Sequence, residues 1–264
     1  MLTRPGLLAS YAASSAVGSA GRAQLIAMKI IPSLALLAAL VALEPATPCA
    51  RAADEDGVAV AILYDTSGSM KETVRDAKGK QSPKYVIANR ALIGIARHIQ
   101  VFATNSASGS PRRIDAGLFI FDNNSAREVV KFGPFNESAF EEFAKDFSNP
   151  VGNTPLGNSL NVAARAVLNS PLSKKHVLVI TDGMNTYGPQ PSAVMPHLKQ
   201  QAEQKKTGLS FHFVAFDVAA KVFDGVKKQG ATVVAAADEK QLDTQLQFIL
   251  AKKILLEDEE PPKK

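Results

Sequence analysis

The stretch Val58-Ala-Val-Ala-Ile-Leu-Tyr64, which continues as Asp65-Thr-Ser-Gly-Ser69, decides the fold class of this chain. Seven hydrophobic residues in succession leave no polar face, a pattern typical of a strand in the middle of a parallel sheet that is covered on both sides. One carboxylate and two hydroxyl side chains follow this strand at alternate positions. Gly68 is expected to give the turn the backbone freedom that it needs. Because ligands bind outside the carboxyl ends of such strands, this turn is a candidate site.

The rest of the chain alternates between strand and helix patterns. Apolar runs predict five further strands, at residues 114–121, 127–132, 176–181, 209–216 and 231–236. Apolar residues at spacings of three and four predict helices that begin near Pro83, Asn136, Pro155, Ala219 and Glu239. The loop at 122–125 is short enough for a hairpin, so one strand should be antiparallel. The sequence therefore predicts an α/β, doubly wound, Rossmann-like fold: a mostly parallel six-stranded sheet with one antiparallel edge strand and helices on both faces.

Two more loops carry polar side chains to the same edge of the predicted sheet. Thr181-Asp182-Gly183 ends the fourth strand, and Gly152-Asn153-Thr154 stands just before a helix whose first residue is Pro155, a favoured residue at that position. The side chains expected to converge are Asp65, Ser67, Ser69, Thr154 and Asp182. Oxygen ligands without His or Cys select Mg²⁺, Mn²⁺ or Ca²⁺ over zinc or copper.

These three loops, in this order, resemble the von Willebrand factor type A domain with its metal-ion-dependent adhesion site, over about residues 56–253. The resemblance implies that Ser67, Ser69 and Thr154 bind the cation directly, with Mg²⁺ favoured, while Asp65 and Asp182 act through bound water. Three neutral hydroxyls would leave the ion electrophilic, so that an acidic group of a partner protein could be its last ligand. The implied function is metal-dependent protein binding, as in cell adhesion.

Other function classes fit the sequence less well. Phosphoryl-transfer hydrolases of the haloacid dehalogenase kind need a second Asp where Ser67 stands, and the chain lacks a nucleophile elbow, a phosphate loop and a dinucleotide fingerprint at a strand end. The four histidines, His98, His176, His197 and His212, form no triad spacing with a Ser or Cys and are expected in the core or on the surface. A structural or assembly module, in which the metal only stiffens the loops, remains an open alternative, as does, with less support, a metal-dependent hydrolase.

The N-terminal segment has the pattern of a secretory signal. Lys29 precedes an apolar run at 30–43 that is too short to span a membrane, and Ala50-Arg-Ala52 supplies a cleavage site. Met28 is the expected start of translation. The predicted organisation is an extension and signal at 1–52, one domain at 53–256, and a charged tail at 257–264, with export to the periplasm or cell exterior. A disordered or targeting leader, or a lipid anchor at Cys49, is the alternative.

Cleavage near Ala52 also changes the charge argument. It removes four basic residues and one acidic residue, so the net charge falls from +5 to +2, which gives no reason to expect a nucleic-acid partner. It removes the single cysteine as well, which suits an oxidising compartment. A basic rim beside the metal could steer an acidic partner, unless it is an ordinary solvated loop; its residues are Lys71, Arg75, Lys78, Lys80 and Lys84. The sequence leaves the oligomeric state open.

Overall fold

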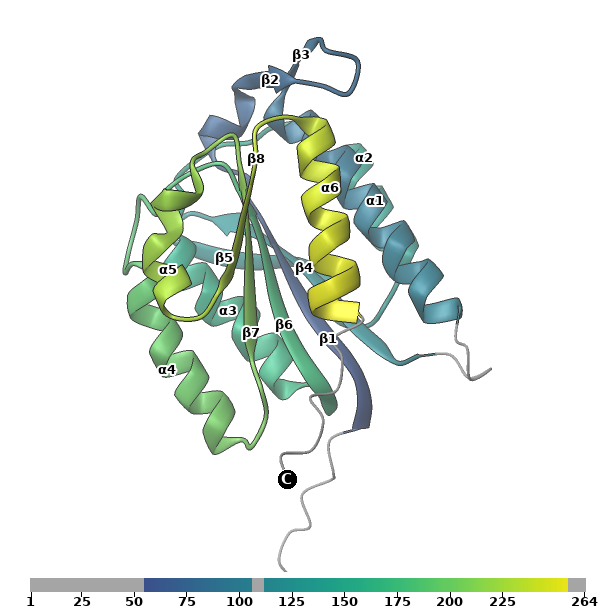
Figure 1. Ribbon diagram of the computed structural model, residues 1–264, viewed down its shortest axis with the longest axis vertical. Coiled ribbons are helices and arrows are strands. Elements are labelled where there is room, and N and C mark those ends of the chain that lie inside the picture. The colour runs from purple at the N-terminus through teal and green to yellow at the C-terminus, as the bar shows by residue number, and fades with distance from the viewer. Residues whose placement is uncertain (1–54, 106–111, 256–264) are drawn as a thin grey trace, which may run out of the picture. The chain divides into compact units, whose positions relative to one another are not determined.

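Six strands form one sheet in the computed structural model, which describes residues 55–105 and 112–255 (Figure 1). The strands are β1 (Glu55–Tyr64), β4 (Ile114–Asp122), β5 (Ser125–Pro134), β6 (Leu172–Thr181), β7 (Ser210–Phe216) and β8 (Thr232–Ala236), in the order β5-β4-β1-β6-β7-β8. Within this six-stranded sheet, only the pairing of β4 with the edge strand β5 is antiparallel. The predicted α/β fold class is therefore confirmed. The predicted signal and tail lie outside the described residues.

Strand β1 occupies the centre of the sheet because both of its faces are apolar. Every residue from Val58 to Tyr64 is buried. Tyr64 pairs with Ile120 of β4 on one side and with Ile180 of β6 on the other. The chain leaves β1 toward β4 and later returns to the opposite side as β6, so the strand order reverses beside β1. In an open α/β sheet, such a reversal opens a crevice at the carboxyl ends of the strands.

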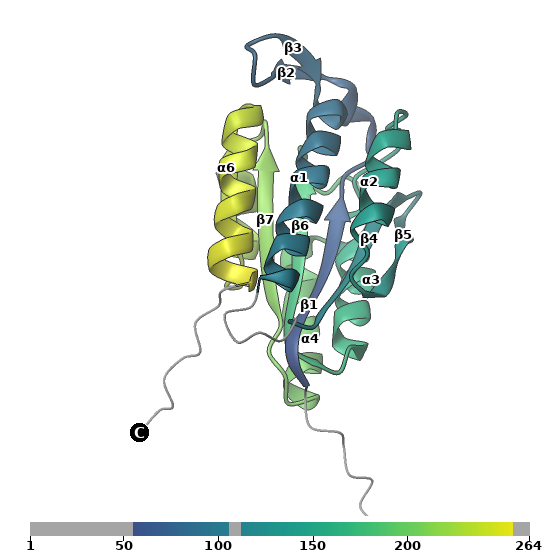
Figure 2. The ribbon, with the colours of Figure 1, turned by 90° about the vertical axis from the view of Figure 1, so that its right-hand side faces the viewer.

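Helices cover both faces of the sheet (Figures 1 and 2). Helices α1 (Lys84–Thr104), α2 (Glu137–Asp146) and α6 (Glu239–Ile249) pack on the face that receives Val60, Ile62 and Tyr64 of β1. Helices α3 (Leu156–Asn169), α4 (Pro191–Gln204) and α5 (Asp224–Lys228) pack on the face that receives Ala59, Ala61 and Leu63. Alternate residues of one strand thus enter two separate hydrophobic clusters.

Three local features differ from the prediction. Helix α4 was not predicted; it contains Pro191 in its first turn and Pro196 in its interior. The polar stretch after Asp65 contains a short 3₁₀ helix, η1 (Gly68–Lys71), and a two-stranded hairpin of β2 (Thr73–Arg75) and β3 (Gln81–Pro83). The predicted helices at the C-terminal side are shorter: η2 (Ala220–Phe223) precedes α5, and α6 passes into a π-helical segment, η3 (Leu250–Leu255).

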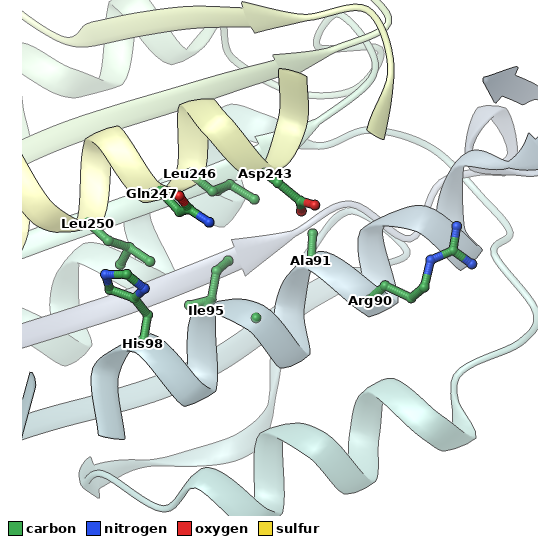
Figure 3. Close-up of a pocket in the computed structure, with 9 residues that line it drawn as sticks. Arg90, Ala91, Ile95, His98, Asp243, Leu246, Gln247 and Leu250 are labelled. Atoms are coloured by element: carbon green, nitrogen blue, oxygen red, sulfur yellow. The ribbon is translucent and has the colours of Figure 1, made fainter. Parts of the chain in front are cut away.

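Helices α1 and α6 lie side by side and leave a groove of about 170 Å³ between them (Figure 3). Arg90 and His98 line it from α1, and Asp243 and Gln247 line it from α6. Gly94 of α1 also lines this groove, and a methyl group at Gly94 would meet nothing within 4 Å.

In the described part of the chain, no helix is both long enough and apolar enough to cross a membrane.

Two glycines within helices provide a matched test of the packing. A Cβ at Gly157 of α3 would lie 2.0 Å from the carbonyl oxygen of Pro189, whereas Gly94 faces open space. We expect Gly157→Ala to lower the free energy of unfolding by about 2 kcal/mol or more, because backbone must move. Gly94→Ala should raise it by about 0.5–1 kcal/mol through helix propensity. Urea unfolding measures both, and equal effects of the two substitutions would contradict the described packing of α3.

Candidate metal centre

Three loops meet at the carboxyl ends of β1 and β6. The loop after β1 is joined to the loop before α3 by two backbone hydrogen bonds, from Gly68 N to the Gly152 oxygen (3.2 Å) and from Val151 N to the Thr66 oxygen (2.7 Å). The loop before α3 is joined to the loop after β6, because Thr154 N donates to Thr186 Oγ1 (2.8 Å) and Thr186 N donates to the Thr154 oxygen (2.9 Å). These hydrogen bonds join the three loops into one continuous surface at the crevice that the strand order predicts.

Asp65 is the buried anchor of this surface. Its Oδ1 accepts a hydrogen bond from Ser67 N (2.7 Å), and its Oδ2 accepts one from Thr181 Oγ1 (2.6 Å). Burial raises the pKa of Asp65 to about 6, the nearby charge of Asp182 adds to this increase, and the hydrogen bonds from Ser67 and Thr181 oppose it. The ionised carboxylate is thus costly where it lies, and a cation beside it would lower that cost.

The hydroxyl groups of the site lie close to the second carboxylate. Ser67 Oγ is 3.1 Å from Ser69 Oγ, and Ser69 Oγ donates to Asp182 Oδ1 at 2.7 Å. Gly183 lies against the same group, because a Cβ at Gly183 would be 3.8 Å from Thr154 Oγ1 and 4.0 Å from Ser69 Oγ. The structure therefore brings together all five residues that the sequence singled out.

The donor set suits a hard cation. It consists of three hydroxyls and two carboxylates, without nitrogen or sulfur. Within residues 55–105 and 112–255, no group of three or more His, Cys, Asp and Glu residues could hold a metal ion. A cation at this edge of the sheet would therefore depend on the hydroxyls, a ligand class that suits Mg²⁺, Mn²⁺ or Ca²⁺ better than softer metals.

The expectation for Gly68 was wrong. This glycine does not have a positive φ, and a Cβ there would make only an ordinary 3.8 Å contact with the Gly152 oxygen. The left-handed backbone occurs instead at Gly152, with φ of 90°. The glycine that the surface needs for its conformation is therefore in the loop before α3, two residues before Thr154.

Lys84 does not belong to an exposed basic rim, which is a second correction. It is the first residue of α1 and its side chain is buried, whereas Lys71, Arg75, Lys78 and Lys80 are exposed. Its Nζ contacts a carboxylate oxygen of each of three residues: Glu72 (2.7 Å), Asp217 (3.0 Å) and Asp182 (3.1 Å). Burial alone would lower the pKa of Lys84, but these three carboxylates raise it well above its usual value.

Sequence reasoning therefore missed Asp217 next to the site and placed Lys84 wrongly, in an exposed rim. Asp217 could have been found, because it follows the last residue of β7 as Asp65 follows β1 and Asp182 follows β6. No comparable pattern marks Lys84, which stands at the end of a charged loop and is brought under Asp182 only by the packing of α1. The loop between β2 and β3 is joined to α6, because Ala77 N donates to Glu239 Oε2 (2.6 Å).

The two buried histidines are not part of this site. His176 Nδ1 and His212 Nε2 are 3.2 Å apart and the rings stack, on β6 and β7 away from the carboxyl ends of these strands. Both side chains are buried, as the sequence analysis allowed. Burial is the main reason that the pKa of His176 falls to about 3 and that of His212 to about 4, so both are neutral near pH 7.

Comparison with known proteins agrees with this architecture. The family model for the von Willebrand factor type A domain matches residues 59–252, which is most of the chain. No curated protein matches the chain at a significant level.

Several solved structures have a similar fold. The PilB minor pilin from Streptococcus sanguinis is similar with a TM-score of 0.56 and 15% sequence identity, over 74% of this chain and 60% of the pilin. The SpRpn10 VWA domain has a TM-score of 0.52 and 12% identity, over 72% of this chain and 94% of that domain. Proximal thread matrix protein 1 from the mussel byssus has a TM-score of 0.51 and 17% identity, over 74% of this chain and 46% of that protein. The chain thus spans three fifths of the pilin, and at these identities the similarity is one of fold.

The hydrogen bond from Thr181 to Asp65 can be tested without any cation. Thr181→Val keeps the shape of the side chain but removes a donor from a fully buried carboxylate. We expect the substitution to lower the free energy of unfolding by about 1–3 kcal/mol in chelator, measured by urea denaturation. The matched control is Thr244→Val, whose exposed hydroxyl bonds to the Lys240 carbonyl within α6 and should change stability by less than about 0.5 kcal/mol. A negligible effect of Thr181→Val would show that Asp65 does not depend on this bond.

Proposed function

This chain belongs to the von Willebrand factor type A domain family, and we propose that it is a protein-binding module that holds a divalent cation at the carboxyl ends of β1 and β6. In this proposal Ser67, Ser69 and Thr154 bind the ion directly, and Asp65 and Asp182 hold it through water. The observation that carries the proposal is the convergence of three neutral hydroxyls and two buried carboxylates from three loops onto one point.

The chemistry of these donors supports Mg²⁺ as the ion, with Mn²⁺ and Ca²⁺ as alternatives. Neutral hydroxyls leave most of the charge of the cation uncompensated. The bound cation would supply an electrophilic point at which an anionic oxygen binds. An acidic side chain of the partner is therefore the group that the site would recognise.

The surroundings of the site support a protein as the partner. Three large apolar side chains are exposed in the two loops beside it: Val151 (58%), Met184 (63%) and Tyr187 (41%). A polar groove of about 640 Å³ extends from Gly152 toward the turn between β4 and β5. Exposed apolar side chains that gather in one region and are bordered by polar groups are typical of an interaction surface. The proposed ligand is accordingly an acidic residue with apolar neighbours.

The proposal includes no catalytic step and includes export. The position that would carry a general acid two residues after Asp65 is occupied by Ser67, which cannot serve that role at neutral pH. Export rests on Lys29, the apolar run at 30–43 and the small residues before position 53, all outside the described residues. Residues 53–256 are proposed as the mature domain.

Stability in the presence of a cation provides the first test. After chelation of the full chain, titration with Mg²⁺, Mn²⁺ or Ca²⁺ should raise the midpoint of thermal unfolding by about 5–10 °C at a concentration a hundredfold above Kd. The Ser67→Ala/Ser69→Ala variant should lose this increase because two of the three proposed direct ligands are gone.

The matched control is Ser173→Ala, near the amino-terminal end of β6, where Ser173 Oγ donates to the Gly57 oxygen. This variant should keep the full increase. If no cation stabilises the unmodified chain, or if the serine double variant is stabilised as much as the unmodified chain, the proposed site is wrong.

Recognition of an acidic group can be tested with defined peptides. We expect immobilised peptides with one Glu flanked by leucines to bind the full chain in Mg²⁺, and matched peptides with Gln in its place to bind at least about tenfold more weakly. Chelator should abolish the difference. Met184→Ala should weaken binding to the Glu peptides and leave the cation affinity unchanged, because Met184 is exposed beside the site. Equal binding of Glu and Gln peptides would contradict an acidic ligand.

A further inference from the structure

A fixed positive charge lies directly behind the candidate cation site. Asp182 faces Ser69 with Oδ1, at 2.7 Å, and faces Lys84 Nζ with Oδ2, at 3.1 Å. The side chain of Lys84 is 3% exposed and that of Asp182 is 0% exposed. The two charges are therefore paired away from water, where their interaction is screened least.

The two other partners of Lys84 differ from Asp182 in exposure. The side chain of Glu72 is 67% exposed and that of Asp217 is 40% exposed. Water screens these two ion pairs more than it screens the buried pair with Asp182, so each of them contributes less than that pair. Asp182 is the carboxylate for which Lys84 matters most, because Lys84 is the only cation paired with this buried charge among residues 55–105 and 112–255.

The position of Lys84 is not explained by the stability of its own helix. It is the first residue of α1, where the helix dipole favours an anion over a cation. Its long side chain instead carries the ammonium group to the ends of β6 and β7, where Asp182 and Asp217 stand. Lys84 therefore supplies a positive charge to the edge of the sheet that carries the candidate site.

We infer that Lys84 is a tethered cation that compensates Asp182 when no metal ion is bound and thereby weakens the affinity of the site for a divalent cation. This inference rests on the proposed function. A divalent ion near Ser69 must either share Asp182 with the ammonium group or displace it, and both cost free energy. Lys84 keeps the site folded without metal and makes the ion exchangeable.

Removal of the ammonium group should therefore tighten metal binding. We expect the Lys84→Met variant of the full chain to bind Mn²⁺ at least about tenfold more tightly than the unmodified chain, with Kd measured by electron paramagnetic resonance of the free ion. In chelator the same variant should unfold at a lower temperature, because Asp182 has lost its counter-charge. The matched control is Lys71→Met, an exposed lysine of η1, which should change Kd by less than about twofold.

The outcomes separate this inference from the proposed function. If the unmodified chain binds Mn²⁺ and Lys84→Met binds it equally or more weakly, the lysine does not weaken the site, although the site itself stands. If Lys71→Met tightens binding as much as Lys84→Met, general surface charge is responsible and the inference is wrong. If neither the unmodified chain nor any variant binds Mn²⁺, the proposed metal site is wrong and the inference fails with it.

A second variant decides the question if Lys84→Met does not fold. Asp217→Asn keeps a residue type that tolerates the φ of 55° at this position, but it leaves the charge of Lys84 less compensated. Mn²⁺ binding should then weaken by about threefold or more. An unchanged Kd for Asp217→Asn would overturn the inference.

Discussion

The carboxylate of Asp65 is the group on which the arrangement of the other loops depends. It stands one residue beyond a strand that is buried along its whole apolar run, so it lies in the interior rather than in water. Such a charge is tolerated only when donors surround it. Ser67 N and Thr181 Oγ1 provide these donors, and in doing so they hold the loop after β1 against the end of β6. The geometry of the candidate site is thus a consequence of satisfying one buried charge.

Much of the fold could be predicted because the periodicities are strong. The uninterrupted apolar run ending at Tyr64 defines the central strand, and the short turn after Asp122 defines the antiparallel edge. Helix α4 escaped prediction because its prolines mask the buried stripe of Val194, Met195, Leu198 and Ala202. The π-helical end of α6 was also missed, since its apolar spacing resembles that of an ordinary helix. Elements with a single dominant signal were predictable, and elements in which two signals compete were not.

The five residues of the candidate site could be predicted from the sequence because they lie in loops that follow a strand or precede a helix at the same edge of the sheet. Their charge balance could not be predicted in this way. Lys84 is distant from Asp182 in the sequence, and its surroundings in the sequence are those of a solvated loop. Only the packing of α1 against the sheet brings the ammonium group to the carboxylate. The site therefore combines two buried anions with one protein cation. A divalent ion would have to compete with the ammonium group of Lys84 for Asp182.

Crystals of the full chain grown with Mn²⁺ would test the central claim most directly, through the anomalous scattering of the ion. The account predicts one Mn²⁺ peak at the carboxyl ends of β1 and β6, bonded to Ser67, Ser69 and Thr154, with Asp65 and Asp182 one water molecule away. A chain without Mn²⁺ at this position, or with the ion bound at another part of the molecule, would contradict it.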